Sequence, residues 1–255
     1  MNVRIASLVP SLTELVVELG LGDLLVARTG FCIHPATRLR DVPKVGGTKD
    51  VNLAKLRRLA PTHVLLNVDE NRLDTAQALE SLGAELVVTH PCGPEDNLGL
   101  VDQLAGVFAA QAGVRERARQ LRGALRDELQ QTQATGRHPC RVLYLIWHDP
   151  WMTVARDTYI SRMLARVNWL SEPAVEGGEH GAARYPVLRG DEPWLAGIER
   201  VLLSSEPFHF TEEHLHLAQA LCPQARVQRV DGELLSWYGP RAVPGLRYLR
   251  ELALT

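Results

Sequence analysis

Short apolar segments alternate with amphipathic segments along most of the chain. The apolar segments are rich in Val, Ile and Leu, as is typical of strands buried on both faces of a parallel sheet. Strands are predicted near 3–8, 25–28, 63–67, 85–89, 141–146, 201–204 and 227–230. Helices are predicted at 11–19, 52–59, 72–82, 161–167, 211–221 and 243–252. This alternation predicts an α/β fold with mainly parallel sheets.

Two helix starts carry capping signals. Ser11 precedes an amphipathic stretch, and Glu14 three residues later fits a capping box. Asn52 stands before the next helical stretch and is a favoured N-cap residue. We therefore expect Ser11 and Asn52 to hold the first amide groups of their helices.

The segment from about 95 to 132 shows a long helical period instead of alternating strand and helix segments. Apolar residues recur there at steps of three or four, with one longer gap near Arg115, and no proline interrupts them. This pattern predicts one helix of roughly 50 Å. The strand–helix alternation resumes afterwards, so this helix is expected to brace two lobes. The predicted fold is two Rossmann-like lobes joined by one long backbone helix, with domains at 1–94, 95–135 and 136–255.

Composition narrows the function classes. The chain has 255 residues, a formal net charge of -2, 45% hydrophobic and 23% charged residues, which fits a globular protein with a proper core. The net charge argues against a nucleic-acid partner, and no apolar run is long enough to span a membrane. Without a visible signal peptide the chain is expected to be cytoplasmic as written, or extracytoplasmic if a signal has been removed.

Cysteine and histidine offer one candidate metal site. The four cysteines form no CxxC pair, so neither a disulfide framework nor a structural zinc site is indicated. Cys32 and His34, with His90 and Cys92, form Cys-x-His and His-x-Cys pairs that would suit a metal. No nucleophile elbow, P-loop or dinucleotide fingerprint is present, so we expect a binding protein rather than an enzyme.

Several segments together resemble one family, the substrate-binding proteins whose two lobes are joined by a single long helix. This class contains the vitamin B12-binding proteins of cobalamin importers and the siderophore- and haem-binding proteins. The resemblance is carried in unchanged order by the segments IASLVPSLTE at 5–14, VGGT at 45–48, NLAKL at 52–56, APTHVLL at 60–66, WHDPWMTV at 147–154, DTYIS at 157–161 and SWYGPR at 236–241.

The resemblance implies a ligand and a partner. The implied ligand is a metal chelate held in the cleft between the lobes. The sequence is most similar to the cobalamin-binding branch of the family, so the resemblance implies cobalamin or another corrinoid, with an iron chelate as the alternative. No catalytic cofactor is implied, and delivery to the permease of an ABC importer is the implied role. Thr48 departs from the pattern, since the cobalamin-binding relative carries a large aromatic residue there.

Candidate ligand contacts come from both halves of the chain. Phe31 and His34 fall in a loop where the family has aromatic contacts, and imidazole is a natural axial ligand for cobalt or iron. All five tryptophans lie after residue 146, and flat rings suit a macrocycle. The expected contacts of the second half are Trp147, Trp151, Trp237, Tyr238 and Arg241.

Two acidic pairs are candidates for docking on a permease, because family members use one acidic residue per lobe for this purpose. These pairs are Asp69 with Glu70 and Asp191 with Glu192. Helix capping is the competing explanation for Asp191. Two functional alternatives stay open: a cytoplasmic corrinoid- or metal-handling protein on the same scaffold, and a Cys/His metalloenzyme.

Overall fold

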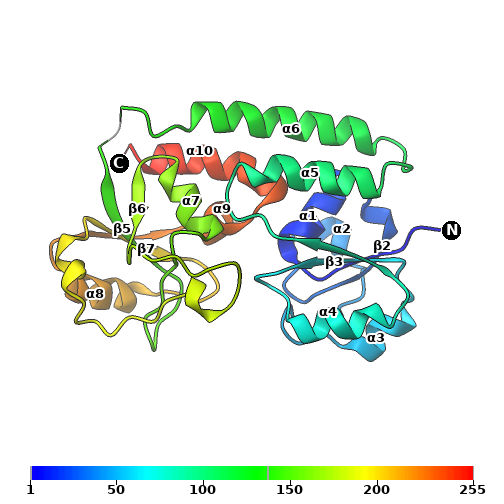
Figure 1. Cartoon of the computed structure of the whole chain (residues 1–255), viewed down its shortest axis with the longest axis horizontal. Helices are drawn as coiled ribbons and strands as arrows, with labels where there is room; N and C mark the ends of the chain where they lie inside the picture. Colours follow the sequence, from blue (N-terminus) through cyan, green and yellow to red (C-terminus); the bar gives the residue numbers. More distant parts are fainter. Residues whose placement is uncertain (1, 137, 255) are drawn as a thin grey trace. The chain divides into compact units, whose positions relative to one another are not determined.

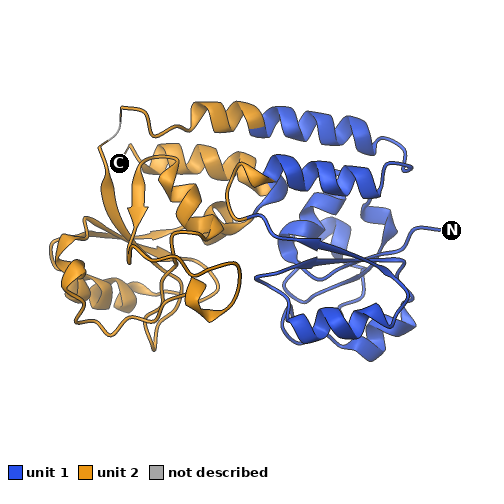
Figure 2. Ribbon diagram, in the orientation of Figure 1, with its two compact units in different colours: residues 1–91, 97–125, 238–240 blue, residues 92–96, 126–237, 241–255 orange. Residues whose placement is uncertain are grey.

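The computed structural model describes residues 2–136 and 138–254, so the outer limits of the expected domains, residues 1 and 255, lie outside it. The chain forms two compact units (Figure 2). Unit 1 comprises the residues up to Pro91, Asn97–Leu125 and Tyr238–Pro240. Unit 2 comprises Cys92–Asp96, Arg126–Trp237 and the residues from Arg241 onward.

Unit 1 is built on a four-stranded parallel sheet in the order β2-β1-β3-β4. Its strands are β1 (Ile5–Ser7), β2 (Leu25–Arg28), β3 (His63–Asn67) and β4 (Glu85–Thr89). One face packs Ala6, Val64 and Leu66 against Leu56 and Leu79. The alternate residue Leu65 is also fully buried, so the central strands are covered on both faces, as their apolar composition requires.

The helices of unit 1 lie on both faces of its sheet (Figure 1). The short helices α3 (Leu53–Arg58) and α4 (Leu73–Glu80) cover one face, while α1 (Pro10–Glu18) and α5 (Asp96–Val107) lie on the other. A single turn, α2 (Ala36–Leu39), follows the loop after β2. Helices on both faces are what a parallel sheet buried on both sides requires.

Unit 2 repeats the architecture with a parallel sheet in the order β6-β5-β7-β8. Its strands are β5 (Cys140–Leu145), β6 (Trp169–Ser171), β7 (Arg200–Ser204) and β8 (Arg226–Val230). The sequence pattern did not predict β6, because three residues are too few to show a period. The two parallel α/β lobes predicted from the sequence are confirmed by this topology.

Helices also cover both faces of the second sheet (Figure 1). Helix α8 (Glu212–Leu221) packs its Ala218 against Leu143, Leu145, Val201 and Leu203. The helices of the other face are α7 (Tyr159–Ala165), α9 (Gly232–Ser236) and α10 (Ala242–Leu252), and short 3-10 turns occur at Gly22–Leu24, Ala182–Arg184, Pro193–Gly197 and Gly239–Arg241.

The expected single helix over 95–132 is wrong in one respect. It is two helices, α5 and α6 (Val114–Gln131), separated by a turn that ends at Gly113 with φ +79°. Within unit 1 the first part of α6 lies beside α5, where Arg122 pairs with Asp102 at 2.9 Å. Both helices bury apolar stripes, but the stripe is broken at the turn, where the buried Phe108 and Val114 lie six positions apart. The longer gap in the apolar pattern was the sequence signal of this turn. Helix α6 begins in unit 1 and ends in unit 2.

One of the two predicted caps is confirmed. The Asn52 side chain accepts a hydrogen bond from the Lys55 amide at 2.8 Å, as an N-cap does. Ser11 does not cap α1, because the helix already begins at Pro10 and the N-cap is Val9. Proline is favoured at the first helical position because it has no amide hydrogen to satisfy there. The capping box with Glu14 is therefore wrong.

A buried carboxylate holds the end of α6 to α10 within unit 2. Glu128 is only 4% exposed, and it accepts hydrogen bonds from Arg247 and from Arg250, the latter at 2.6 Å. Burial alone would raise the pKa of Glu128, but the hydrogen bonds and charges of the two arginines outweigh it and hold the pKa below its ordinary value. No helix within residues 2–136 and 138–254 has both the length and the apolar character needed to cross a bilayer.

Replacement of Glu128 by Ala should lower the free energy of unfolding by about 3 kcal/mol, because it leaves two arginines without their buried partner. The pKa of Glu128 is depressed in the folded state, so its contribution should be complete at neutral pH and decline as pH falls below about 4.5. Urea unfolding at pH 7 and pH 4 measures both effects. Asp127→Ala, at an exposed neighbouring position, is the control and should change stability by less than about 0.5 kcal/mol.

Candidate functional site

The strand order of each sheet marks where a ligand is expected. In unit 1 the chain passes from β1 to β2 on one side and then to β3 on the other, so the order reverses between β1 and β3. In unit 2 it reverses between β5 and β7. Open parallel sheets bind ligands outside the carboxyl ends of their strands at such switch points. A ligand is therefore expected at the loops that follow these four strands.

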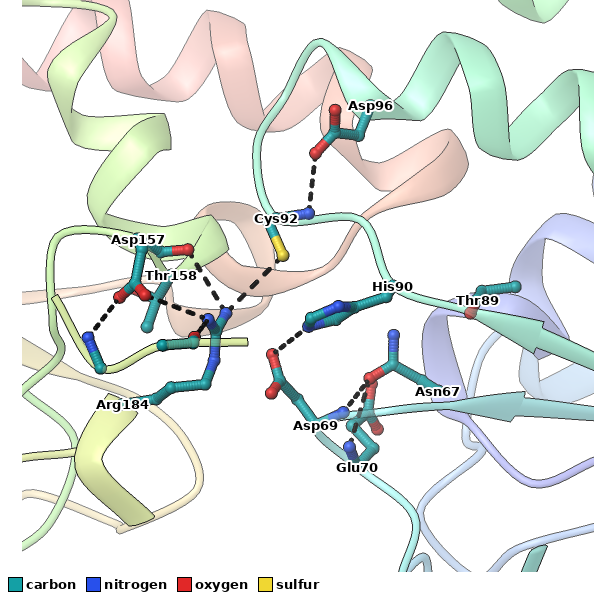
Figure 3. A network of polar contacts seen from close by, with 12 residues as sticks. Asn67, Asp69, Glu70, Thr89, His90, Cys92, Asp96, Asp157, Thr158 and Arg184 are labelled. Carbon is teal, nitrogen blue, oxygen red and sulfur yellow. Dashed lines mark hydrogen bonds and ion pairs between the residues drawn. The ribbon is translucent and has the colours of Figure 1, made fainter. Parts of the chain in front are cut away.

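Two asparagines organise the carboxyl edge of unit 1. The Asn67 side chain accepts hydrogen bonds from the amides of Asp69 at 2.8 Å and Glu70 at 3.2 Å (Figure 3). The buried Asn71 side chain donates to the carbonyls of Thr48 at 3.0 Å and Leu8 at 3.4 Å. The loops after β1 and β3 and the loop containing Thr48 are thereby tied together.

The expected docking acids Asp69 and Glu70 are engaged inside unit 1. Asp69 lies 3.4 Å from the His90 imidazole (Figure 3), and the Lys49 ammonium donates to the Asp69 carbonyl at 2.7 Å. The Tyr238 hydroxyl donates to Glu70 at 2.9 Å. Partial burial lowers the pKa of Lys49, although Glu70 and Asp69 oppose the shift. These acids thus have structural partners, and their part in docking stays a prediction.

The loop after β2 presents apolar side chains on a fixed backbone. Phe31 is 61% exposed, and Ile33 is also exposed. Cys32 between them is fully buried, with its thiol 3.1 Å from the Thr29 hydroxyl. Arg28, the last residue of β2, donates to the Cys32 carbonyl at 3.0 Å and so anchors the loop to the end of the strand. His34 is partly buried and precedes the cis peptide bond to Pro35.

The predicted Cys/His metal site has no support among the described residues, and it stays a prediction. Burial raises the pKa of the Cys32 thiol, which disfavours the thiolate that a metal needs. Cys92 belongs to unit 2, where its amide donates to Asp96 at 2.8 Å and Arg184 lies 3.8 Å from its sulfur (Figure 3). Across the described part of the chain, no group of three or more His, Cys, Asp and Glu side chains is placed to hold a metal ion.

Aromatic and imidazole rings gather at the switch point of unit 2. Trp147 follows β5, Phe208 follows β7, and their ring centroids lie 5.3 Å apart with the rings edge to face. We call the aromatic cluster the set Trp147, His148, Trp151, Phe208, Phe210 and His214. Trp147 is 40% exposed, and a large exposed ring in such a cluster is typical of a surface that meets a partner.

A helix cap positions one side of this cluster. The Thr211 side chain and the His214 ring form a capping box at the start of α8, in which His214 Nδ1 accepts from the Thr211 amide at 3.0 Å. His214 then lies 5.0 Å from His148 and 5.1 Å from Phe208, measured between ring centroids. The sequence prediction missed Phe208, Phe210 and His214; their only local signal was the alternation in 208–210.

Trp237 and Tyr238, two of the expected ligand contacts, are both buried, and Trp237 is the C-cap residue of helix α9. Trp237 is 7% exposed, and its indole N–H donates to Glu206 at 2.6 Å. Arg241 stacks over the Trp237 ring at 5.0 Å and donates to Glu233 at 3.0 Å. These contacts stabilise the loop after β7. Direct contact of Trp237, Tyr238 and Arg241 with a ligand stays a prediction.

The second acidic pair has one exposed member. Asp191 is 77% exposed and pairs with Arg189 at 3.1 Å. Glu192 turns back and accepts from the amides of Arg189 at 2.7 Å and Gly190 at 2.9 Å. Asp191 does not cap a helix, since the following turn has Glu192 at its N-cap with no side-chain hydrogen bond. The capping explanation for Asp191 is therefore wrong, and its part in docking stays a prediction.

Comparison with known proteins gives two kinds of likeness. No family model matches the chain. A vitamin B12-binding protein of Vibrio cholerae is 25% identical over 214 residues, covering 83% of this chain and 71% of the relative. The ABC transporter substrate-binding lipoprotein YvrC of Bacillus subtilis is 23% identical over 254 residues, covering 97% of this chain and 79% of the relative.

Solved structures show the same fold over the whole chain. The periplasmic vitamin B12 binding protein BtuF of Vibrio cholerae superposes with a TM-score of 0.79 and 21% identity, covering 99% of this chain and 98% of BtuF. The periplasmic haem binding protein HutB of the same organism has a TM-score of 0.78 and 23% identity, covering all of both chains. The fold is that of the two-lobed substrate-binding proteins with a long connecting helix, and the resemblance to that family is confirmed.

The close approach of Gly232 to Glu206 gives a stability test. A Cβ at Gly232 would lie 2.3 Å from the Ser204 hydroxyl and 2.9 Å from Glu206 Cγ, so Gly232→Ala should lower the free energy of unfolding by about 1–3 kcal/mol. A Cβ at Gly123 of α6 would meet nothing within 4 Å, so Gly123→Ala should raise it by up to about 1 kcal/mol. Chemical denaturation of both variants measures the contrast, and equal effects would contradict it.

Proposed function

We propose that the protein is the substrate-binding component of an importer and binds a flat metal chelate, a corrinoid or a haem-type ligand. The observation that carries the proposal is the exposed ring of Trp147 within the aromatic cluster, at the switch point of the unit 2 sheet. The names of the relatives agree with this choice, because they include vitamin B12-binding and haem-binding proteins.

The aromatic cluster suits a conjugated ring for a physical reason. Trp147 packs edge to face with Phe208, so little side-chain entropy is lost when a ligand stacks on its ring. Burying a large part of an indole face against an apolar ring contributes on the order of 1.5–3 kcal/mol. A flat chelate uses such a face fully, whereas a small polar solute does not.

Unit 1 offers a second apolar surface, formed by the exposed Phe31 and Ile33 on the anchored loop after β2. His34 follows them in the same loop, and we propose it as an axial ligand of the chelated metal, since imidazole suits both cobalt and iron. Of the acidic residues expected to meet a permease, the exposed Asp191 fits that role best. The alternative of a cytoplasmic corrinoid-handling protein shares the ligand and differs in lacking a permease.

Trp147→Ala should weaken the binding of hydroxocobalamin or haemin by about tenfold to a hundredfold, because it removes the stacking face. Titration of the purified protein, followed by ligand absorbance and tryptophan fluorescence, measures the dissociation constants. Leu73→Ala, which removes an apolar side chain that is 72% exposed, is the control and should leave them unchanged. Binding of neither chelate by the unaltered protein would refute the proposed function.

His34→Ala tests the axial ligand separately. If the imidazole replaces the water on hydroxocobalamin, binding to the unaltered protein should shift the corrin absorbance bands, and the variant should bind without that shift. His216→Ala, a change on the exposed side of α8, should keep the shift. The same spectrum in both variants would show that His34 does not coordinate the metal, while leaving chelate binding in place.

A further inference from the structure

We infer that Glu206 determines specificity by the periphery of the ligand: it favours rings whose side chains end in carboxamides and disfavours rings whose side chains end in carboxylates. The inference rests on the proposed function and deepens it. It concerns a residue that lies outside the predicted set of ligand contacts.

The position of Glu206 connects it to the aromatic cluster. Glu206 lies two residues after β7, at the switch point of the unit 2 sheet. Only Pro207 separates it from Phe208, whose ring contacts Trp147. Glu206 and the aromatic cluster therefore share one turn, and we place the periphery of a ring stacked on Trp147 at this turn.

The carboxyl group of Glu206 is fixed through one oxygen. Oε1 accepts hydrogen bonds from the Ser236 hydroxyl at 2.8 Å and the Trp237 indole at 2.6 Å. Gly232 allows the backbone of α9 to approach Glu206 closely. The second oxygen, Oε2, accepts no hydrogen bond from residues 2–136 or 138–254. The side chain is only partly buried, so Oε2 is the atom that a ligand can use.

The charge around Glu206 is not balanced by a cation. No lysine, arginine or histidine in the described chain forms an ion pair with it, and the nearby Arg241 is engaged by Glu233. Burial raises the pKa of Glu206, and the charges of Glu233 and Asp231 raise it further, while Ser236 and Trp237 lower it. This turn is therefore a hydrogen-bond acceptor of negative character.

A carboxamide fits such a group in both of its protonation states. The amide NH2 donates to the ionised carboxylate, and the amide carbonyl accepts from the protonated acid. A ligand carboxylate fits only the protonated acid and is repelled by the ionised form. The choice between the two kinds of ring periphery is thus set by one side chain rather than by the apolar stacking surface, which treats both rings alike.

The test uses two probes with the same corrin ring. Dicyanocobinamide carries carboxamide side chains, and dicyanocobyrinic acid carries carboxylates in their place. The unaltered protein should bind the amide form at least about tenfold more tightly. Glu206→Gln keeps the acceptor for Ser236 and Trp237 but removes the charge, and should reduce that ratio about tenfold. Glu206→Met, an apolar side chain of similar length, should reduce it as well.

The matched control is Glu199→Gln, because Glu199 precedes the same strand β7 at its opposite end and accepts from the Arg141 amide. It removes one charge from unit 2 and should leave the ratio unchanged. An unchanged ratio in both Glu206 variants, or equal binding of the two probes by the unaltered protein, would overturn the role of Glu206. Failure of the unaltered protein to bind either corrin or haemin would instead overturn the proposed function.

Discussion

Burial of the central strands on both faces is the constraint on which the rest of each unit depends. In β3 and β7, consecutive residues such as Val64 and Leu65, or Leu202 and Leu203, are alike buried. Side chains within these strands have no route to solvent or to a ligand. Chemistry is therefore confined to the strand ends, and the reversal of strand order selects the ends of two adjacent strands in each sheet.

The loops at those ends are held by hydrogen bonds to buried polar groups rather than by regular structure. Asn71 ties three loops of unit 1 together, and Arg28 holds the loop that presents Phe31. In unit 2 the pair formed by Glu206 and Trp237 does the same for the turn after β7. Each such bond satisfies a polar group that would be costly to bury alone, so the loop geometry is specified strongly.

The tryptophans show that the environment of a residue, and not its type alone, decides whether it serves the core or a ligand surface. All five lie in the second half of the chain, yet they differ in what they do. Trp169 and Trp237 are almost fully buried, whereas Trp147 remains exposed beside Phe208. Exposure of a large ring in a fixed orientation is what distinguishes a ligand surface from a core residue of the same type.

The sequence alone determined the two α/β lobes, most strand positions, the Asn52 cap and the family resemblance, because these depend on local periodicity and local chemistry. The single helix predicted for α5 and α6 was wrong, because the gap in the apolar pattern at the turn was outweighed by the similar stripes that both helices bury. Only the tertiary structure joined Phe208 and His214 to Trp147 and paired Glu206 with Trp237. Those contacts link residues far apart in the chain, because the order of the strands in the sheet brings the loops that carry them together.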